Sequence, residues 1–137
     1  KGYVKATIAT NNITQPAGAF NKIPFDTVAE DARGEFSAST NTFTALENGT
    51  YLVNTSVYFG PGTAGENLSL FYYVNGTAVY APGRVTRPGT AGLTIDCTIP
   101  VKLNAGDKLY IAAYSQTSPV NYTGNFPTWT FLHIAQM

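Results

Sequence analysis

The chain has 137 residues, enough for one domain with a hydrophobic core, and we expect a single domain spanning residues 1–137. Eight Lys and Arg residues balance eight Asp and Glu residues, so charge gives no reason to expect binding to nucleic acid or anionic lipid. The single cysteine, Cys97, excludes an internal disulfide and a cysteine-based zinc site. No apolar run is long enough to span a bilayer, so membrane insertion is not expected.

Short stretches that alternate between apolar and polar residues follow one another along the chain. Residues 51–59 alternate between two faces, and residues 93–103 do so most regularly. Asn75 and Gly76 lie between two extended runs and are a strong signal for a two-residue hairpin. Turn signals recur about every 8–12 residues and no convincing helix is found, which predicts an all-β sandwich or jelly roll.

Two later strands lack a polar face. Residues 108–114 and 128–137 are apolar on both faces, although a single sandwich offers only one core. Aromatic residues are enriched at the centres of subunit interfaces, and a monomer exposing them would aggregate. We therefore predict a subunit interface that contains Tyr58, Tyr110, Tyr114 and Phe131.

The most specific pattern lies between residues 25 and 51. Its aromatic, acidic and glycine positions are Phe25, Asp31, Phe36, Phe43, Gly49 and Tyr51. This spacing resembles the signature of the complement C1q globular domain, a jelly roll shared with the tumour necrosis factor family. That signature continues with aromatic residues where this chain has Val53 and Thr55, which indicates a divergent relative. A surface rich in Asn and Thr, with little charge and no disulfide, suits a bacterial or phage-type member better than a serum protein.

The resemblance implies a ten-stranded jelly roll that assembles as a homotrimer and forms the C-terminal head of a longer chain. Bacterial and phage relatives occur on spore coats and virion fibres, so the expected location is extracellular, on a cell or spore surface, or on a virion. The predicted core joins the aromatic residues of the pattern to one face of residues 93–103: Phe25, Phe36, Phe43, Tyr51, Ile95, Cys97, Ile99 and Val101.

Two segments with proline and glycine, residues 82–91 and 115–127, are predicted to be exposed loops. Arg84 and Arg87 in the first loop can grip a carboxylate or phosphate through two hydrogen bonds. Tyr122 in the second can stack on a sugar ring. These three residues are the candidate ligand contacts. The alternative interpretation is a solvated arginine loop and aromatic residues that belong to the core.

No catalytic residue is assigned, and an enzyme is not expected. His133, the only histidine, lies between two apolar residues and has no nucleophile motif beside it. Cys97 lies on an apolar face, whereas reactive thiols need an accessible, electropositive setting. No cofactor is expected, with calcium as the one candidate ion. Its oxygen ligands would come from an acidic cluster whose alternative is a solvated turn: Asp26, Glu30, Asp31 and Glu35.

Two functional hypotheses are compatible with these features. The leading one is a non-enzymatic, trimeric recognition head at the tip of a surface or virion fibre. Its exposed loops would bind an extracellular ligand, for which a host-surface glycan is the candidate. The alternative is a structural trimerisation cap of a spore-surface or phage fibre protein that binds no ligand of its own.

Overall fold

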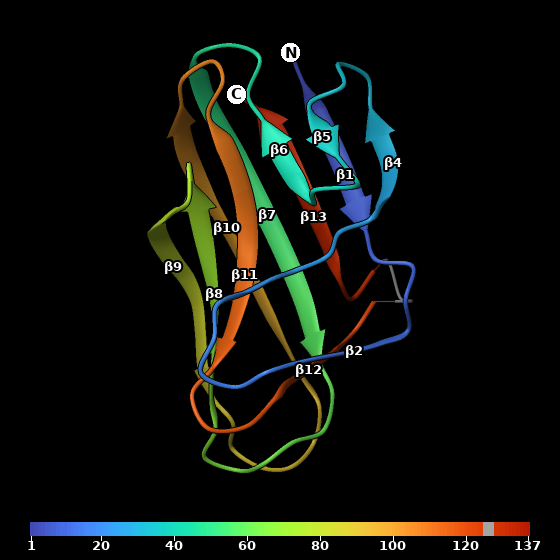
Figure 1. The fold of residues 1–137 in the computed structure, drawn as a ribbon, viewed down its shortest axis with the longest axis vertical. Coiled ribbons are helices and arrows are strands. Elements are labelled where there is room, and N and C mark those ends of the chain that lie inside the picture. The colour runs from blue at the N-terminus through green and yellow to red at the C-terminus, as the bar shows by residue number, and fades with distance from the viewer. Residues whose placement is uncertain (125–127) are drawn as a thin grey trace.

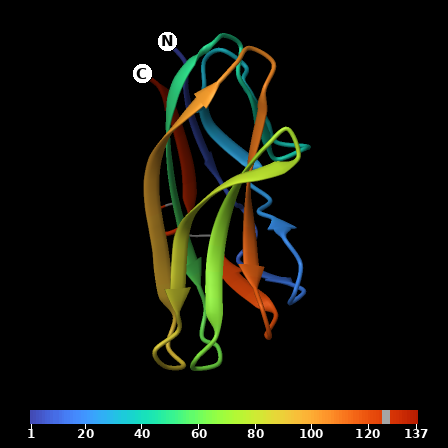
Figure 2. The ribbon, with the colours of Figure 1, turned by 90° about the vertical axis from the view of Figure 1, so that its left-hand side faces the viewer.

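The computed structural model describes residues 1–124 and 128–137, and these form two β-sheets without a helix. None of the described residues therefore belongs to a helix that could span a membrane. Figure 2 shows the sheets as two layers of one sandwich. The predicted all-β sandwich is confirmed, although the strands are shorter and more numerous than the ten expected.

The first layer, sheet A, follows the order β2, β12, β7, β13, β1, β4, and β10 also pairs with β7. Every pairing in this sheet is antiparallel. Its strands are β1 (Tyr3–Thr7), β2 (Asn12–Gln15), β4 (Thr27–Asp31), β7 (Gly49–Phe59), β10 (Leu93–Leu103), β12 (Val120–Thr123) and β13 (Phe131–Gln136).

The second layer, sheet B, follows the order β5, β6, β11, β8, β9, and β3 also pairs with β11. It too is antiparallel throughout. Its strands are β3 (Asn21–Lys22), β5 (Phe36–Ser37), β6 (Thr42–Thr44), β8 (Asn67–Val74), β9 (Thr77–Thr86) and β11 (Lys108–Ser115).

The central pair of sheet A is β7 with β10, which stay in register from Gly49 opposite Leu103 to Phe59 opposite Leu93. Because side chains alternate along a strand, this register brings the apolar positions of both strands to the inner face. Six predicted core residues are buried, and Cys97 and Ile99 are partly buried and pack against them. The six are Phe25, Phe36, Phe43, Tyr51, Ile95 and Val101.

The aromatic residues of the 25–51 pattern hold the two sheets together. Phe43 on β6 meets Tyr51 on β7 edge to face, with ring centroids 5.4 Å apart, and Phe36 lies opposite Phe43 in the β5–β6 pair. Phe25 is fully buried beside them in the same core cluster. The pattern therefore specifies packing between layers.

The β8–β9 hairpin confirms the turn predicted at Asn75 and Gly76. Both residues have positive φ, 52° and 80°, as a tight two-residue hairpin turn requires, and Val74 pairs with Thr77 across it. The strand that follows runs on to Thr86, so the prediction of a loop over residues 82–91 was wrong for its first half. Pro82 is tolerated there because β9 is the edge strand of sheet B.

The second predicted loop, residues 115–127, was also wrong in part, because residues 120–123 form β12. Residues 125–127 of that segment lie outside the described residues. The two termini lie together at one end of the sandwich, and the connections after β7, β9 and β11 lie at the opposite end (Figure 1). We call this opposite end the distal end.

Candidate ligand-binding face

The outer face of sheet B carries a row of aromatic side chains. On β8, Phe71 and Tyr73 alternate with the buried Leu70 and Tyr72, and the same alternation on β11 turns aromatic residues outward. The rings of Tyr73 and Tyr110, which are cross-strand partners, stack at 4.9 Å with an interplanar angle of 8°. Such pairs stabilise an antiparallel sheet and leave flat apolar surfaces outward.

Phe20 packs over this row. It is 54% exposed, although its ring stacks on Tyr114 at 4.8 Å and meets Phe71 edge to face at 5.0 Å. Lys22 Nζ lies 4.3 Å from the centroid of the Tyr110 ring. A cation over an aromatic face is a favourable contact, so the row is ordered by its own packing.

Beside the row lies a hollow of about 250 Å³. Its floor is Ser69, which pairs with Tyr114 on one side and with Arg84 on the other. The three side chains thus form one transverse line over β11, β8 and β9. Because neighbouring strands are about 4.8 Å apart, the backbones of Tyr114 and Arg84 are roughly 10 Å apart, with the small serine between them. Phe71 forms a wall of the hollow, and Asn67 and Gln116 lie on its rim.

Charge is distributed unevenly over the strands of sheet B. They contain Lys22, Arg84 and Lys108, and none of their described residues is Asp or Glu. Arg84 is exposed, lines the hollow and forms no ion pair with any described residue. A net-neutral chain thus has a sheet whose strands carry only positive charge.

Arg87 is not an exposed ligand contact, contrary to the sequence-based prediction. It is 3% exposed, and its Nε lies 3.3 Å from Glu66 Oε2. Its Nη1 also donates a hydrogen bond to the Ala91 carbonyl, and Ser115 Oγ donates one to Glu66 Oε1 at 2.6 Å. This buried network joins the segments after β7 and β9 to the end of β11. It thereby fixes the backbone next to the rim of the hollow.

Tyr122 was also wrongly predicted as an accessible ligand contact. Its ring is fully buried in the core and meets Phe59 edge to face at 6.1 Å. Its hydroxyl donates a hydrogen bond to Gln15 Oε1 at 2.7 Å, and burial raises the pKa of the phenol. The residue therefore packs the end of sheet A and presents no face to a sugar.

The predicted interface residues fall on two opposite surfaces. Tyr58 and Phe131 belong to sheet A, whose buried Val57, Phe59, Leu132 and Ile134 show that the two aromatic residues point outward. Tyr110 and Tyr114 belong instead to the outward row of sheet B. Each of the four is half-buried within the single chain.

The outer face of sheet A has a hollow of its own, of about 450 Å³. Phe131, His133 and Lys5 line it, and the Phe131 and His133 rings stack at 4.3 Å. Around it, Tyr3 and Leu52 are each 37% exposed. Apolar side chains are thus gathered over β1, β7 and β13.

The acidic cluster proposed for calcium does not converge. No group of three or more potential ligands is close enough to hold a metal ion within the described residues. Asp26 and Asp31 accept backbone hydrogen bonds from Ala9 and from Glu35 and Phe36, respectively, and Glu30 lies 3.8 Å from Lys5 Nζ. The carboxylates therefore bind local partners, and among the described residues they do not form the joint calcium site that was considered as a candidate.

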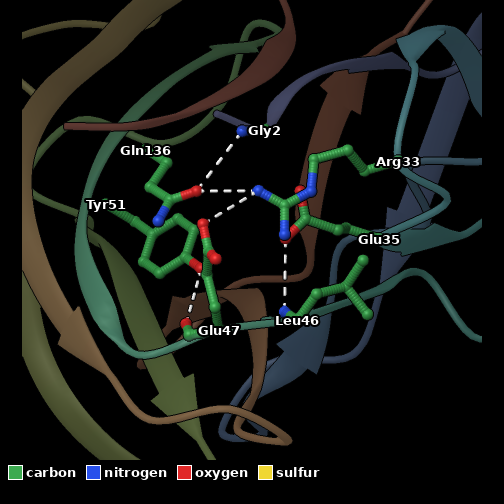
Figure 3. A network of polar contacts seen from close by, with 7 residues as sticks. All are labelled: Gly2, Arg33, Glu35, Leu46, Glu47, Tyr51 and Gln136. Carbon is green, nitrogen blue, oxygen red and sulfur yellow. Dashed lines mark hydrogen bonds and ion pairs between the residues drawn. The ribbon is translucent and has the colours of Figure 1, made fainter.

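Glu35 is the buried member of that group and belongs to a network near the termini (Figure 3). Its Oε2 accepts a hydrogen bond from the Leu46 backbone, while its Oε1 has no hydrogen-bond partner among residues 1–124 and 128–137. Arg33 Nη1 lies between Glu47 Oε1 at 3.1 Å and Gln136 Oε1 at 2.9 Å. These contacts tie the turn before β5 to the last strand.

Neither His133 nor Cys97 has the surroundings of a catalytic group. Burial and the nearby charge of Lys5 lower the pKa of His133, whose ring contacts are with Phe131 and Tyr3. Burial raises the pKa of Cys97, which disfavours the thiolate, and its sulfur lies 3.6 Å from the Tyr72 hydroxyl. The face beside Arg84 offers a cation, polar groups and aromatic surfaces.

No family model matches the chain, and no curated protein sequence does. Solved structures do match. The globular domain of zebrafish complement 1qA is 17% identical, with 100% of this chain and 98% of that chain covered and a TM-score of 0.70. Murine APRIL is 14% identical over 100% of both chains, with a TM-score of 0.72. Eiger, a TNF from S. frugiperda, is 13% identical, with 100% and 94% covered and a TM-score of 0.64.

These likenesses establish the fold: the chain is a C1q/TNF-like jelly roll, as the 25–51 pattern indicated. At such low identity, these likenesses concern the fold alone.

Proposed function

We propose that the protein is a non-enzymatic, homotrimeric recognition head that binds a glycan at the hollow beside Arg84. The observation that carries this proposal is the line of Tyr114, Ser69 and Arg84 across three strands. An aromatic wall, a small floor and a guanidinium that has no ion pair among the described residues form a concave site with a few directed polar groups, as is typical of sites for small ligands.

The two outer faces have different roles in this proposal. Copies of the chain associate through sheet A, where Tyr58, Phe131 and exposed apolar neighbours form a surface that a partner would cover. Opposite faces of a slab cannot both be buried in a closed ring of three, because contacts on opposite faces stack copies into an open filament. Tyr110 and Tyr114 on sheet B are therefore assigned to the ligand face.

The position of the hollow supports a role at the tip of a fibre. It is formed at the distal end of β8, β9 and β11, away from the two termini (Figure 1). A stalk joined at the N-terminus would leave this end accessible. We place the protein at an extracellular surface, on a cell, a spore or a virion, and its partners are further copies of itself and a surface glycan.

A glycan array tests ligand binding directly. The array is probed with the wild-type protein, with Arg84→Ala, and with Lys1→Ala as a matched loss of an exposed cation outside both sheets. We expect wild type and Lys1→Ala to bind the same glycans and Arg84→Ala to lose them. Binding that is unchanged in Arg84→Ala would contradict the site. A blank array for the folded wild type would favour the structural trimerisation cap.

A further inference from the structure

The geometry points to a specific class of glycan: we infer that the hollow binds a sugar that carries a carboxylate, with the carboxylate on Arg84 and the sugar ring against Tyr114 and Phe71. This inference rests on the proposed function and specifies the ligand of the same site. It follows from the charge of the whole face, the register across the strands and the support beneath the hollow.

The charge of the face selects an anion. Sheet B strands carry Lys22, Arg84 and Lys108 and no carboxylate among their described residues. Three acidic residues directly precede strands of sheet B, and all are engaged elsewhere. Glu35 is buried and accepts a hydrogen bond from the Leu46 backbone, Glu66 is buried in its pair with Arg87, and Asp107 accepts hydrogen bonds from Asn75 and Asn104. An anion approaching Arg84 therefore meets no competing carboxylate on these strands.

The chemistry of Arg84 fits a carboxylate. A guanidinium presents parallel N–H donors that match the two oxygens of a carboxylate and is always protonated. Arg84 is exposed and forms no ion pair within the described part of the chain, so its donors can turn to a ligand. Its distance from Tyr114, two strand spacings or roughly 10 Å, leaves room for one sugar ring over Ser69.

The site is preorganised from below. Glu66 directly precedes the rim residue Asn67, and Ser115 directly precedes the rim residue Gln116. Ser115 donates a hydrogen bond to Glu66, and Arg87 donates another to Glu66. These bonds hold in place the backbone that carries the rim. Arg87 is thus a positioning residue. Binding to a preformed site loses less conformational entropy than binding that orders a loop.

The aromatic row extends the site along the sheet. From Tyr114, ring contacts lead through Phe20 to Phe71 and Tyr73, and from there to Tyr110. Lys22 lies over the last ring and places a second cation at that end. A longer chain of acidic sugars would find both cations and the flat rings between them. A neutral oligosaccharide would use only the rings.

The test is a calorimetric titration with paired ligands that have the same sugar rings and differ in the charge of the carboxyl group. Sialyllactose is compared with its methyl ester, and trigalacturonate with its fully methyl-esterified form. We expect each acidic ligand to bind at least about tenfold more tightly than its neutral partner, since one hydrogen-bonded charge pair accounts for a factor of that size. Preference for sulfated lactose over both carboxylated ligands would overturn the assignment to a carboxylate.

Three variants locate the effect. Arg84→Gln should abolish the preference for the acidic ligand, and Arg84→Lys, which keeps the charge but lacks the paired donors, should retain only part of it. Lys1→Gln, outside both sheets, should behave as wild type. If wild type binds the acidic and the neutral ligand equally well, this inference is overturned, but the proposal that the protein recognises a glycan is not. Binding of no glycan by the folded trimer would overturn both.

Discussion

Arg87 and Glu66 form an ion pair inside the distal end of the sandwich, with Nε and Oε2 3.3 Å apart and both side chains at most 3% exposed. A buried charge without its partner is strongly destabilising. Arg87→Ala should therefore reduce the free energy of unfolding by about 3–5 kcal/mol, measured by urea denaturation at a fixed protein concentration. Arg84→Ala is the matched control and should change it by less than about 0.5 kcal/mol. If the two substitutions lower the free energy of unfolding equally, Arg87 is not the buried structural arginine and Arg84 the exposed one, as proposed.

Tyr72 provides a test of the core between the sheets. Its buried hydroxyl donates to Thr55 Oγ1 at 3.0 Å and also lies 3.3 Å from the Val53 carbonyl, and burial raises the pKa of the phenol. Tyr72→Phe should lower the free energy of unfolding by about 1–2 kcal/mol, because it leaves buried acceptors with one donor fewer. Tyr122→Phe removes a hydroxyl whose acceptor, Gln15, is partly exposed and can bind water instead. Tyr122→Phe should therefore lower the free energy of unfolding by less than Tyr72→Phe does. A larger loss for Tyr122→Phe would contradict this account of the core.

His133 makes the stability of the protein depend on pH. Its pKa in the folded protein is lowered from 6.5, first by burial and then by Lys5, with Glu30 acting in the opposite direction. The unfolded chain therefore binds a proton at His133 more readily than the folded protein does. The contribution of neutral His133 to the free energy of unfolding is fully present above pH 6.5 and is lost as the pH falls through the folded pKa. Thermal unfolding between pH 7 and 5 should show a smaller decline in His133→Gln than in wild type. Parallel declines in the two proteins would contradict this role.

The fold was predictable because its signals are local. The alternation of residues 93–103 and the turn at Asn75 and Gly76 each determine their own structure, and both predictions were confirmed. The site depended on contacts between distant residues. Arg87 looked exposed because prolines and glycines surround it, but its partner Glu66 lies 21 residues earlier, and no local pattern reveals the pair.

The aromatic row had a signal in the sequence that the prediction did not use. Residues 67–74 show an apolar face, and the opposite face of the same strand holds Phe71 and Tyr73 beside Ser69. Aromatic residues on the face turned away from the core indicate a binding surface when the neighbouring strand repeats them. The register that aligns Ser69 with both Tyr114 and Arg84 is set by strand pairing, so only the structure could show the hollow.

The proposal that sheet A forms the trimer interface and sheet B the ligand face is tested most directly by light scattering on two matched variants. Phe131→Arg and Phe71→Arg each place a charge at a half-buried, outward phenylalanine, the first on sheet A and the second on sheet B. Cooperative thermal unfolding shows that each variant is folded. We predict that wild type and Phe71→Arg have three times the 14.6 kDa mass of one chain and that Phe131→Arg has the mass of a monomer. A monomeric wild type, or a trimer lost in Phe71→Arg and kept in Phe131→Arg, would contradict the account.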